Sequence, residues 1–326
     1  MAGWIALSDH EADPAGTGPL LARAMLAFEI ALPLPGPALI LDHRDSRGWD
    51  RAFSIFADPA SGIVIRHRQG PGQAVHVLRA PLAGVGAARV LFDWDGPARR
   101  WQMRLRLPGA ELALRVEGVN PLPLPTEDLR ALCRGAVRHP ALLWIGATDG
   151  RRLPTAPDWI GPQTPIPTDR GVRAAIDLRA GDRVICDGGL RPLRALRVGR
   201  MPARGSFAPV LLRAPYFGRN ADLLVSASQH IGFSGPAVGY AFAEEEAIAR
   251  AADIVDDRRA LWDQRRSATT CVALDLGSEP AVVRADGCAL AIRGTDGGLP
   301  GIRRLAGYEC AALLGLMGRG SRRNAA

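Results

Sequence analysis

The stretch TPIPTDRGVRAAIDLRAGDRV, residues 164–184, carries the strongest fold signal in the sequence. Thr164 and Thr168 favour a strand through their β propensity, and a glycine turn follows them. The overlapping segment DRVICDGGLRPLRALRVG, residues 182–199, has Asp-Gly-Gly at 187–189 to supply the positive φ of a tight hairpin. These residues therefore predict a strand, a turn and a β-hairpin in succession.

The chain beyond this hairpin stays rich in predicted strands. The apolar runs are APVLLRAPYF (208–217), ADLLVSASQHIGF (221–233), TTCVALDL (269–276), PAVVRADG (280–287) and CALAIRG (288–294). Two helices are also expected. The first is a short one in EEEAIARAADIV (244–255), and the second is GYECAALLGLMGR (307–319), where good helix formers end with an arginine facing the negative end of the helix dipole.

The first 118 residues predict a β-sandwich. In RWQMRLRL (100–107), Met103 and Leu105 share one face while the arginines take the other, which is the period of a half-buried strand. Regular strand spacing with Pro and Gly turns between the strands favours a sandwich. The other predicted strands are AFEIALPL (27–34), PALILDH (37–43), AFSIFAD (52–58), GIVIRHR (62–68), AVHVLRA (74–80), RVLFDWD (89–95) and ELALRVEG (111–118).

The length of 326 residues indicates two domains, and the pattern locates their boundary. A proline-rich connecting segment is expected over 119–158, with a helix in EDLRALCR capped by Thr126 and ended by Gly135, and a strand in HPALLWIGATDG (139–150). The predicted organisation is a sandwich over 1–118, the connecting segment, a second β domain over 159–295, and a C-terminal helix and tail over 296–326.

The second half resembles the Hedgehog/intein, or Hint, domains of bacteria, from residue 159 to about residue 295 and more loosely in the last helix. The resemblance follows the order of several blocks. These are the opening strand and glycine turn with Leu178, Gly181, Asp182 and Val184, then the hairpin, the block PVLLRAP…ADLLVSASQH, the segment AIARAADIVDDRR (247–259) and the closing ADG (285–287). The resemblance implies an all-β chain, in which a Hint-type fold with a short C-terminal helix follows the sandwich.

The resemblance also implies a chemistry whose residues are largely missing. In such domains a cysteine or serine at the first position attacks the preceding carbonyl, assisted by a threonine and a histidine. Here Trp159 takes the nucleophile's position, and indole has neither thiol nor hydroxyl. His230 matches the family's histidine, but Ala227 stands where a threonine or serine belongs, between the hydroxyls of Ser226 and Ser228. The later block reads CVALDLGSEPAVV (271–283), and no histidine follows His230.

We therefore expect a Hint domain that has lost its catalysis and serves binding or assembly, with His230 as a residual catalytic residue or simply a structural histidine. Two alternatives stay open. One is glycan binding through the N-terminal sandwich. The other is active self-processing near residue 159, for which the nearby substitute nucleophiles are Thr155, Thr164, Thr168 and Cys186.

The first half resembles the concanavalin-like, laminin-G-type sandwich in the order and spacing of its predicted strands, without a diagnostic motif. Such domains often bind glycans or proteins, sometimes through calcium. The candidate calcium ligands Asp42, Asp45, Asp93 and Asp95 stand among arginines and form no dense oxygen cluster in the sequence. We expect no metal and no cofactor, and a protein or glycan as partner.

The net charge of +8 does not indicate a specific nucleic-acid partner, because the basic residues, all arginines, are dispersed among acids and apolar residues. The five cysteines lie far apart without metal-ligand spacing, so we expect them to be buried apolar residues. The start MAGWIALSDHEADPAG predicts no cleavable signal, and the most apolar window, 20–41, is interrupted by charges and prolines. We expect a soluble protein whose compartment stays open, either the cytoplasm or an exported location.

Overall fold

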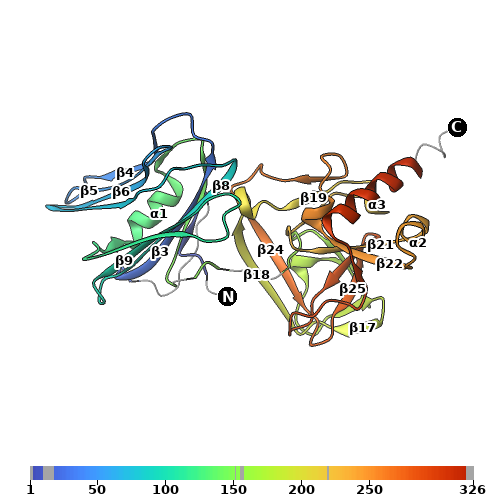
Figure 1. Ribbon diagram of the computed structural model, residues 1–326. Coiled ribbons are helices and arrows are strands. Elements are labelled where there is room, and N and C mark those ends of the chain that lie inside the picture. The colour runs from blue at the N-terminus through green and yellow to red at the C-terminus, as the bar shows by residue number, and fades with distance from the viewer. Residues whose placement is uncertain (1–2, 10–17, 151, 155–157, 219, 321–326) are drawn as a thin grey trace. The chain divides into compact units, whose positions relative to one another are not determined.

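A computed structural model gives the structure of the protein and describes residues 3–9, 18–150, 152–154, 158–218 and 220–320. The chain forms two compact units. The first contains Met1–Thr155, Pro202–Ser206 and Arg265–Thr269, and the second contains Ala156–Met201, Phe207–Gln264 and Thr270–Ala326. Both are built mainly from strands (Figure 1), which confirms the predicted all-β fold class.

The first unit is a sandwich of two antiparallel sheets. One sheet has the order β1-β13-β3-β8-β9-β10, the other has the order β12-β4-β5-β6-β7, and β11 pairs with β2. Figure 1 shows β4, β5 and β6 in one layer and β3, β8 and β9 in the other. The strands are β1 (Ala6–Leu7), β2 (Leu20–Leu21), β3 (Arg23–Leu32), β4 (Ala38–Asp45), β5 (Arg51–Asp58), β6 (Gly62–Gln69), β7 (Gly72–Leu78), β8 (Gly86–Asp95), β9 (Arg100–Arg106), β10 (Leu114–Val119), β11 (Leu124–Pro125), β12 (Val137–Arg138) and β13 (Leu142–Thr148).

The alternation in the sequence explains the core of the sandwich. Met103 and Leu105 of β9 are fully buried, as predicted, and Phe53 and Ile55 of β5 face them from the other sheet within the same core cluster. The intervening residues of these strands point away from the core, since successive side chains alternate across a sheet.

Residues 119–158 contribute β11, α1 (Thr126–Arg134), β12 and β13 to the first unit. Helix α1 contacts β13 of one sheet and β4 of the other. The predicted cap at its start is wrong in detail. Pro125 is the N-cap, and Thr126, the first helical residue, uses its hydroxyl to donate to the carbonyl of Gly18 at 2.6 Å.

A fully buried glutamate joins a distant segment to this unit. Glu29 on β3 accepts hydrogen bonds from the Nε of Arg89 at 2.8 Å, from the backbone N–H of Ser206 at 2.9 Å and from the Ser206 hydroxyl at 2.5 Å. Gly205 approaches so closely that a Cβ there would lie 2.2 Å from the carboxylate. The neighbouring position must therefore be glycine, which also suits its φ of +62°.

The second unit consists of small sheets that share one core. Their orders are β15-β14-β16-β17, β18-β24, β20-β19-β23 and β25-β26-β21-β22-β27. The strands are β14 (Pro165–Thr168), β15 (Gly171–Ala174), β16 (Arg183–Cys186), β17 (Gly189–Pro192), β18 (Ala195–Pro202), β19 (Val210–Leu212), β20 (Leu223–Val225), β21 (His230–Ser234), β22 (Glu246–Arg250), β23 (Ala260–Trp262), β24 (Ala268–Asp275), β25 (Ala281–Ala285), β26 (Cys288–Ile292) and β27 (Arg303–Arg304).

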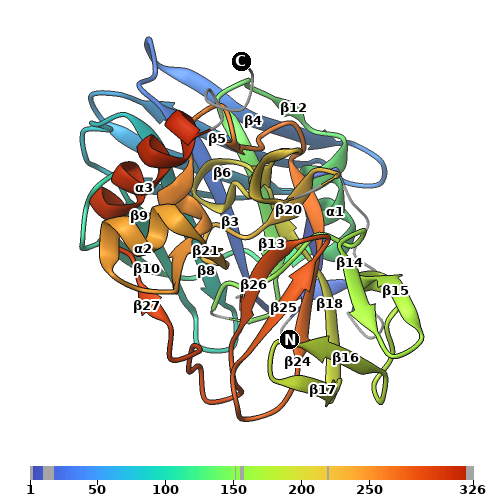
Figure 2. The ribbon, with the colours of Figure 1, turned by 90° about the vertical axis from the view of Figure 1, so that its right-hand side faces the viewer.

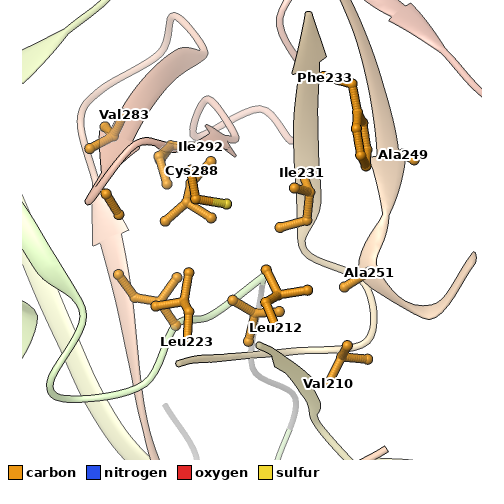
Figure 3. Close-up of a cluster of buried hydrophobic side chains, with 14 of the residues drawn as sticks. Val210, Leu212, Leu223, Ile231, Phe233, Ala249, Ala251, Val283, Cys288 and Ile292 are labelled. Carbon is orange, nitrogen blue, oxygen red and sulfur yellow. The ribbon is translucent and has the colours of Figure 1, made fainter. Parts of the chain in front are cut away.

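The core of the second unit gathers alternate residues from several of these strands. Figure 3 shows Ile231 of β21 close to Leu212 of β19 and Cys288 of β26, all buried. The strand–turn–hairpin predicted for 164–199 is confirmed as β14, β15 and the β16–β17 hairpin.

The helices of this unit differ from the expectation. The predicted α3 is present (Gly307–Gly320), and α2 (Pro236–Phe242), which had no clear signal, lies beside it in Figure 2. The helix predicted over 244–255 is wrong, because Glu246–Arg250 forms β22 between β21 and β27. Short 3₁₀ helices occupy Ala175–Asp177, Gly205–Phe207, Tyr216–Gly218 and Ala251–Ile254.

Candidate functional site

The candidate site lies where the chain enters the second unit, next to the start of β21. Ile160 forms isolated bridges to Val225 at the end of β20 and to Val272 on β24, which fixes the preceding residues against both strands. His230 begins β21 and is paired in register with Ala291 of β26. The entering segment, the turn before β21 and the end of β26 therefore converge on one place.

Trp159, the residue at the predicted nucleophile position, is held by its backbone. Its N–H donates to the hydroxyl of Ser226 at 3.1 Å, and its carbonyl accepts the N–H of Ser226 at 2.9 Å. The resemblance to Hint domains places Ala227 at the hydroxyl-bearing position, whereas in the structure the side chain of Ser226 contacts this amide. The first hydrogen bond holds the Asp158–Trp159 peptide and the second holds the Trp159–Ile160 peptide, both without help from the indole.

The indole of Trp159 is a core side chain. It is 5% exposed and packs in a cluster with Met201, Cys271 and Ala273. This position offers no hydroxyl or thiol, and the apolar surroundings suit an indole better than an ionised group.

Asp158 was missed by the sequence reasoning, although it is the centre of the site. Its Oδ2 accepts from the Nε of Arg293 at 2.7 Å and lies 3.8 Å from the Nδ1 of His230, which is long for a hydrogen bond. Burial raises the pKa of the Asp158 carboxyl, but polar contacts from His230 and Ser228 and the charge of Arg293 outweigh it, so the pKa lies below its usual value. The carboxylate is therefore ionised at neutral pH.

The surroundings of the imidazole are partly polar. Gln229, itself buried, donates to the carbonyls of His230 and Ala291 at 3.1 and 2.8 Å and so fixes the start of β21. The Nδ1 of His230 is buried and makes no hydrogen bond within the part of the chain that the structure describes. A cavity of about 180 Å³ adjoins these residues, lined among others by Asp158, Trp159, Gln229, Arg293 and Thr295.

Three of the substitute nucleophiles named from the sequence, Thr164, Thr168 and Cys186, make no contact with this amide among the described residues. Thr168 donates its hydroxyl to the carbonyl of Gly171 at 2.6 Å, and the hydroxyl of Thr164 is buried without a hydrogen bond to any described residue. Desolvation raises the pKa of the buried Cys186 thiol. Thr155 lies outside the described residues.

Cys271 is the thiol that packs beside Trp159. Desolvation raises its pKa to about 11, so it is protonated at neutral pH. Its Sγ lies 3.3 Å from the carbonyl of Gly199. All five cysteines lie among the described residues, where each is buried and none forms a disulfide.

The calcium candidates of the first unit are engaged by arginines. The ion pairs are Asp42–Arg44 at 3.1 Å, Asp45–Arg51 at 2.8 Å, Asp93–Arg104 at 3.2 Å and Asp95–Arg23 at 2.9 Å. Among the described residues, no group of three or more His, Cys, Asp or Glu side chains is arranged to hold a metal ion. Within the same residues, no helix is long and apolar enough to cross a membrane.

Comparison with known proteins bears on the second unit. Residues 161–291 match the family described as the Hint domain, so this part of the chain contains a Hint-type domain, as the resemblance implied. Among curated proteins, none matches the sequence.

Solved structures similar to parts of the chain include two inteins. The gp41-1 intein is 9% identical, with 43% of this chain and 100% of that chain covered and a TM-score of 0.28. The MchDnaB-1 intein is 15% identical, with 41% and 99% covered and a TM-score of 0.27. A further structure is the Ruminococcus gnavus IT-sialidase CBM40 bound to α2,3-sialyllactose, at 14% identity, 45% and 93% coverage and a TM-score of 0.31.

Proposed function

We propose that the Hint domain of this protein does not cleave the chain and that it serves a binding or assembly role. The observation that carries the proposal is the indole of Trp159, buried among Met201, Cys271 and Ala273 at the nucleophile's position. An acyl shift needs an ionisable or activated side chain there, and indole provides none.

The size of the expected loss in cleavage rate decides whether the domain is impaired or inactive. In a serine protease, removal of the nucleophile costs roughly 10⁶-fold in rate, equivalent to about 8 kcal/mol of transition-state stabilisation. A comparable loss turns a reaction of minutes into one of years. The remaining hydroxyl of Ser226 and the imidazole of His230 hold or face the junction, but neither replaces the missing bond-forming atom.

The ion pair at the junction supports the same proposal. Arg293 and the ionised carboxylate of Asp158 tie the residue before Trp159 to the end of β26. The pair is partly buried, and separating it leaves the largely buried carboxylate of Asp158 unpaired in a poorly solvated place, so one fixed geometry is favoured. The proposed role of the junction is therefore structural: it anchors the first residues of the second unit.

The intact mass of the purified full-length chain tests the proposal. After long incubation with and without DTT, which would intercept a thioester, we expect one species of 34.7 kDa under both conditions. Two fragments that meet near Trp159, and that disappear in His230→Ala but persist in the control His139→Ala, would establish the alternative of active self-processing.

A further inference from the structure

The outer face of the five-stranded sheet in the first unit has a hollow where small side chains on β5 are flanked by larger ones on β4 and β6. Ala52 on β5 is paired in register with Arg44 on β4 and with Arg68 on β6. Two residues further along β5, on the same face, Ser54 is paired with Asp42 on β4 and with Arg66 on β6. Paired residues point to the same face, so the short side chain of Ala52 lies between two arginines and that of Ser54 lies between an aspartate and an arginine.

This face is the one turned away from the core. Phe53 and Ile55, which alternate with the short residues of β5, are buried in the sandwich. The hollow has a volume of about 400 Å³, within the range of small-ligand sites. It is lined by Arg44, Asp45, Ser46, Asp50, Arg51, Ala52, Ser54, Arg66 and Arg68.

The arginines of the hollow differ in how far their charge is neutralised. The charge of Arg51 is neutralised by three carboxylates, Asp45 at 2.8 Å, Glu127 at 2.7 Å and Asp128 at 3.4 Å. Arg66, in contrast, contacts the uncharged amide of Gln73 and no carboxylate among the described residues. Its positive charge is therefore available to a ligand.

The other two arginines each form an exposed ion pair, and Arg68 also donates to the carbonyl of Gly70. Arg44 is 79% exposed and pairs with Asp42 at 3.1 Å, and Arg68 pairs with the exposed Asp50 at 3.3 Å. Exposed ion pairs of this kind contribute little stability, so a ligand carboxylate can displace them at small cost. Arg44 on β4 and Arg66 and Arg68 on β6 therefore line the hollow from the two strands that flank β5.

An exposed aromatic ring adjoins the same end of the sheet. The indole of Trp49 is 55% exposed and packs on Gly70, where a Cβ would lie 2.9 Å from the ring. The carbonyl of Gly70 accepts from the Nε of Arg68 at 3.1 Å. Gly70 therefore contacts both the indole of Trp49 and the guanidinium of Arg68. A flat apolar ring next to cationic groups suits a ligand with both a sugar-like apolar face and a negative charge.

We propose that this hollow binds a compact, carboxylate-bearing saccharide, with Arg66 as the principal charge partner and Trp49 as the platform for a sugar ring. Guanidinium groups bind carboxylates through paired hydrogen bonds. The Ser54 hydroxyl at the floor donates to Asp42 at 2.6 Å, so its oxygen can accept a hydrogen bond from a sugar hydroxyl. The exposed carboxylate of Asp50 in the lining opposes a long polyanion, which makes a nucleic acid the less suitable ligand.

Calorimetry on the full-length chain tests this proposal. The probes are trigalacturonate, α2,3-sialyllactose and a chondroitin disaccharide, each compared with its methyl ester, which removes only the carboxylate charge. We expect at least one acid to bind more tightly than its ester, and Arg66→Ala to weaken that binding roughly 10- to 100-fold.

Two further variants keep the test sharp. Arg115→Ala, which removes an exposed arginine from β10 of the same unit, serves as the matched control and leaves the affinity unchanged. Ala52→Glu, which puts a carboxylate on the floor of the hollow, abolishes binding even if Arg66→Ala folds poorly. The proposal is overturned if no acid binds better than its ester at millimolar concentration, if Arg66→Ala has no effect, or if only a single-stranded oligonucleotide binds. The readout is ligand binding, so it can fail independently of the proposal that the chain stays uncleaved.

Discussion

The carboxylate of Asp158 and the guanidinium of Arg293 are 135 residues apart in the sequence, and their Oδ2 and Nε atoms lie 2.7 Å apart in the structure. This ion pair fixes the first described residue of the second unit, directly before Trp159, to the residue that follows β26. It also explains how a junction that lacks a nucleophile keeps a defined geometry.

Removal of the cation is expected to destabilise the second unit. Arg293→Met leaves the largely buried carboxylate of Asp158 without its main charge partner and should lower the free energy of unfolding by about 1–3 kcal/mol. Urea denaturation measures the change. The exposed pair Arg115–Glu117 provides the control, and Arg115→Met should change the stability by about 0.5 kcal/mol or less.

The effect of Arg293→Met should also depend on pH. The pKa of Asp158 is lowered in the folded state, so the stability that the pair contributes is present above the ordinary carboxyl pKa of 3.8 and is lost as the pH falls below it. The difference between wild type and Arg293→Met should therefore be largest near neutral pH and shrink in acid. A difference that grows on acidification would contradict the assigned ionisation of Asp158.

Restoration of a thiol tests whether the rest of the site still functions. Trp159→Cys places a nucleophile on an amide whose N–H is already bound by Ser226. We expect cleavage between residues 158 and 159 that depends on DTT and is slowed by His230→Ala, detected by intact mass. Trp159→Ala controls for the cavity left by the indole, which costs about 3–5 kcal/mol for a buried tryptophan. Equal cleavage in Trp159→Ala and Trp159→Cys would show that the thiol plays no part.

Two buried histidines should make the first unit sensitive to acid. His67 and His76 lie in the sandwich core, and burial lowers the pKa of each to about 4. The unfolded chain takes up protons on these rings as the pH falls below about 6.5, while the folded chain does not until about pH 4. Stability should fall over this window by up to about 3 kcal/mol for each ring.

The urea midpoint measured from neutral pH down to about pH 4.5 checks this expectation. His76→Leu should flatten the profile, because the ring of His76 packs against Phe92 and Trp101 and an apolar side chain suits that site. His139→Leu, at a partly exposed position, should leave the slope unchanged. A profile for His76→Leu as steep as that of the wild type would rule out His76 as its source.

The thiol next to Trp159 should be unreactive in the folded protein. Cys271 is buried and has a pKa of about 11, so iodoacetamide should label it slowly at neutral pH compared with the unfolded chain. Trp159→Ala should increase labelling at Cys271 selectively, because the two side chains share one cluster. Peptide mapping identifies the labelled cysteine, and uniform labelling of all five would indicate global unfolding instead.

Regular alternation made most strands predictable. Residues 100–107 and 62–68 have a period of two, and β9 and β6 appear there within a residue or so. The segment 244–255 misled the prediction because alanine and glutamate favour helices, whereas the pairing of Glu246–Arg250 between β21 and β27 overrides that preference. Helix propensity depends on the residues of the segment alone and does not include its pairing with distant strands.

The candidate site was only half predictable for the same reason. Trp159 and His230 follow from position within a recognisable order of blocks. The roles of Asp158 and Ser226 do not, because one depends on an arginine at residue 293 and the other on which of three neighbouring residues faces the Trp159 amide. Such contacts arise from the folded arrangement, and no spacing in a single sequence encodes them.

Glu29 and Ser206 have a consequence for how this gene can be divided. A recombinant fragment that stops at residue 158 lacks Ser206 and therefore two of the three donors that satisfy a fully buried carboxylate. Such a fragment should expose apolar surface, aggregate or require co-expression with the remainder. Residues 1–158 are therefore expected to be less stable alone than within the full chain, and Glu29→Gln should narrow that difference because it removes the buried charge.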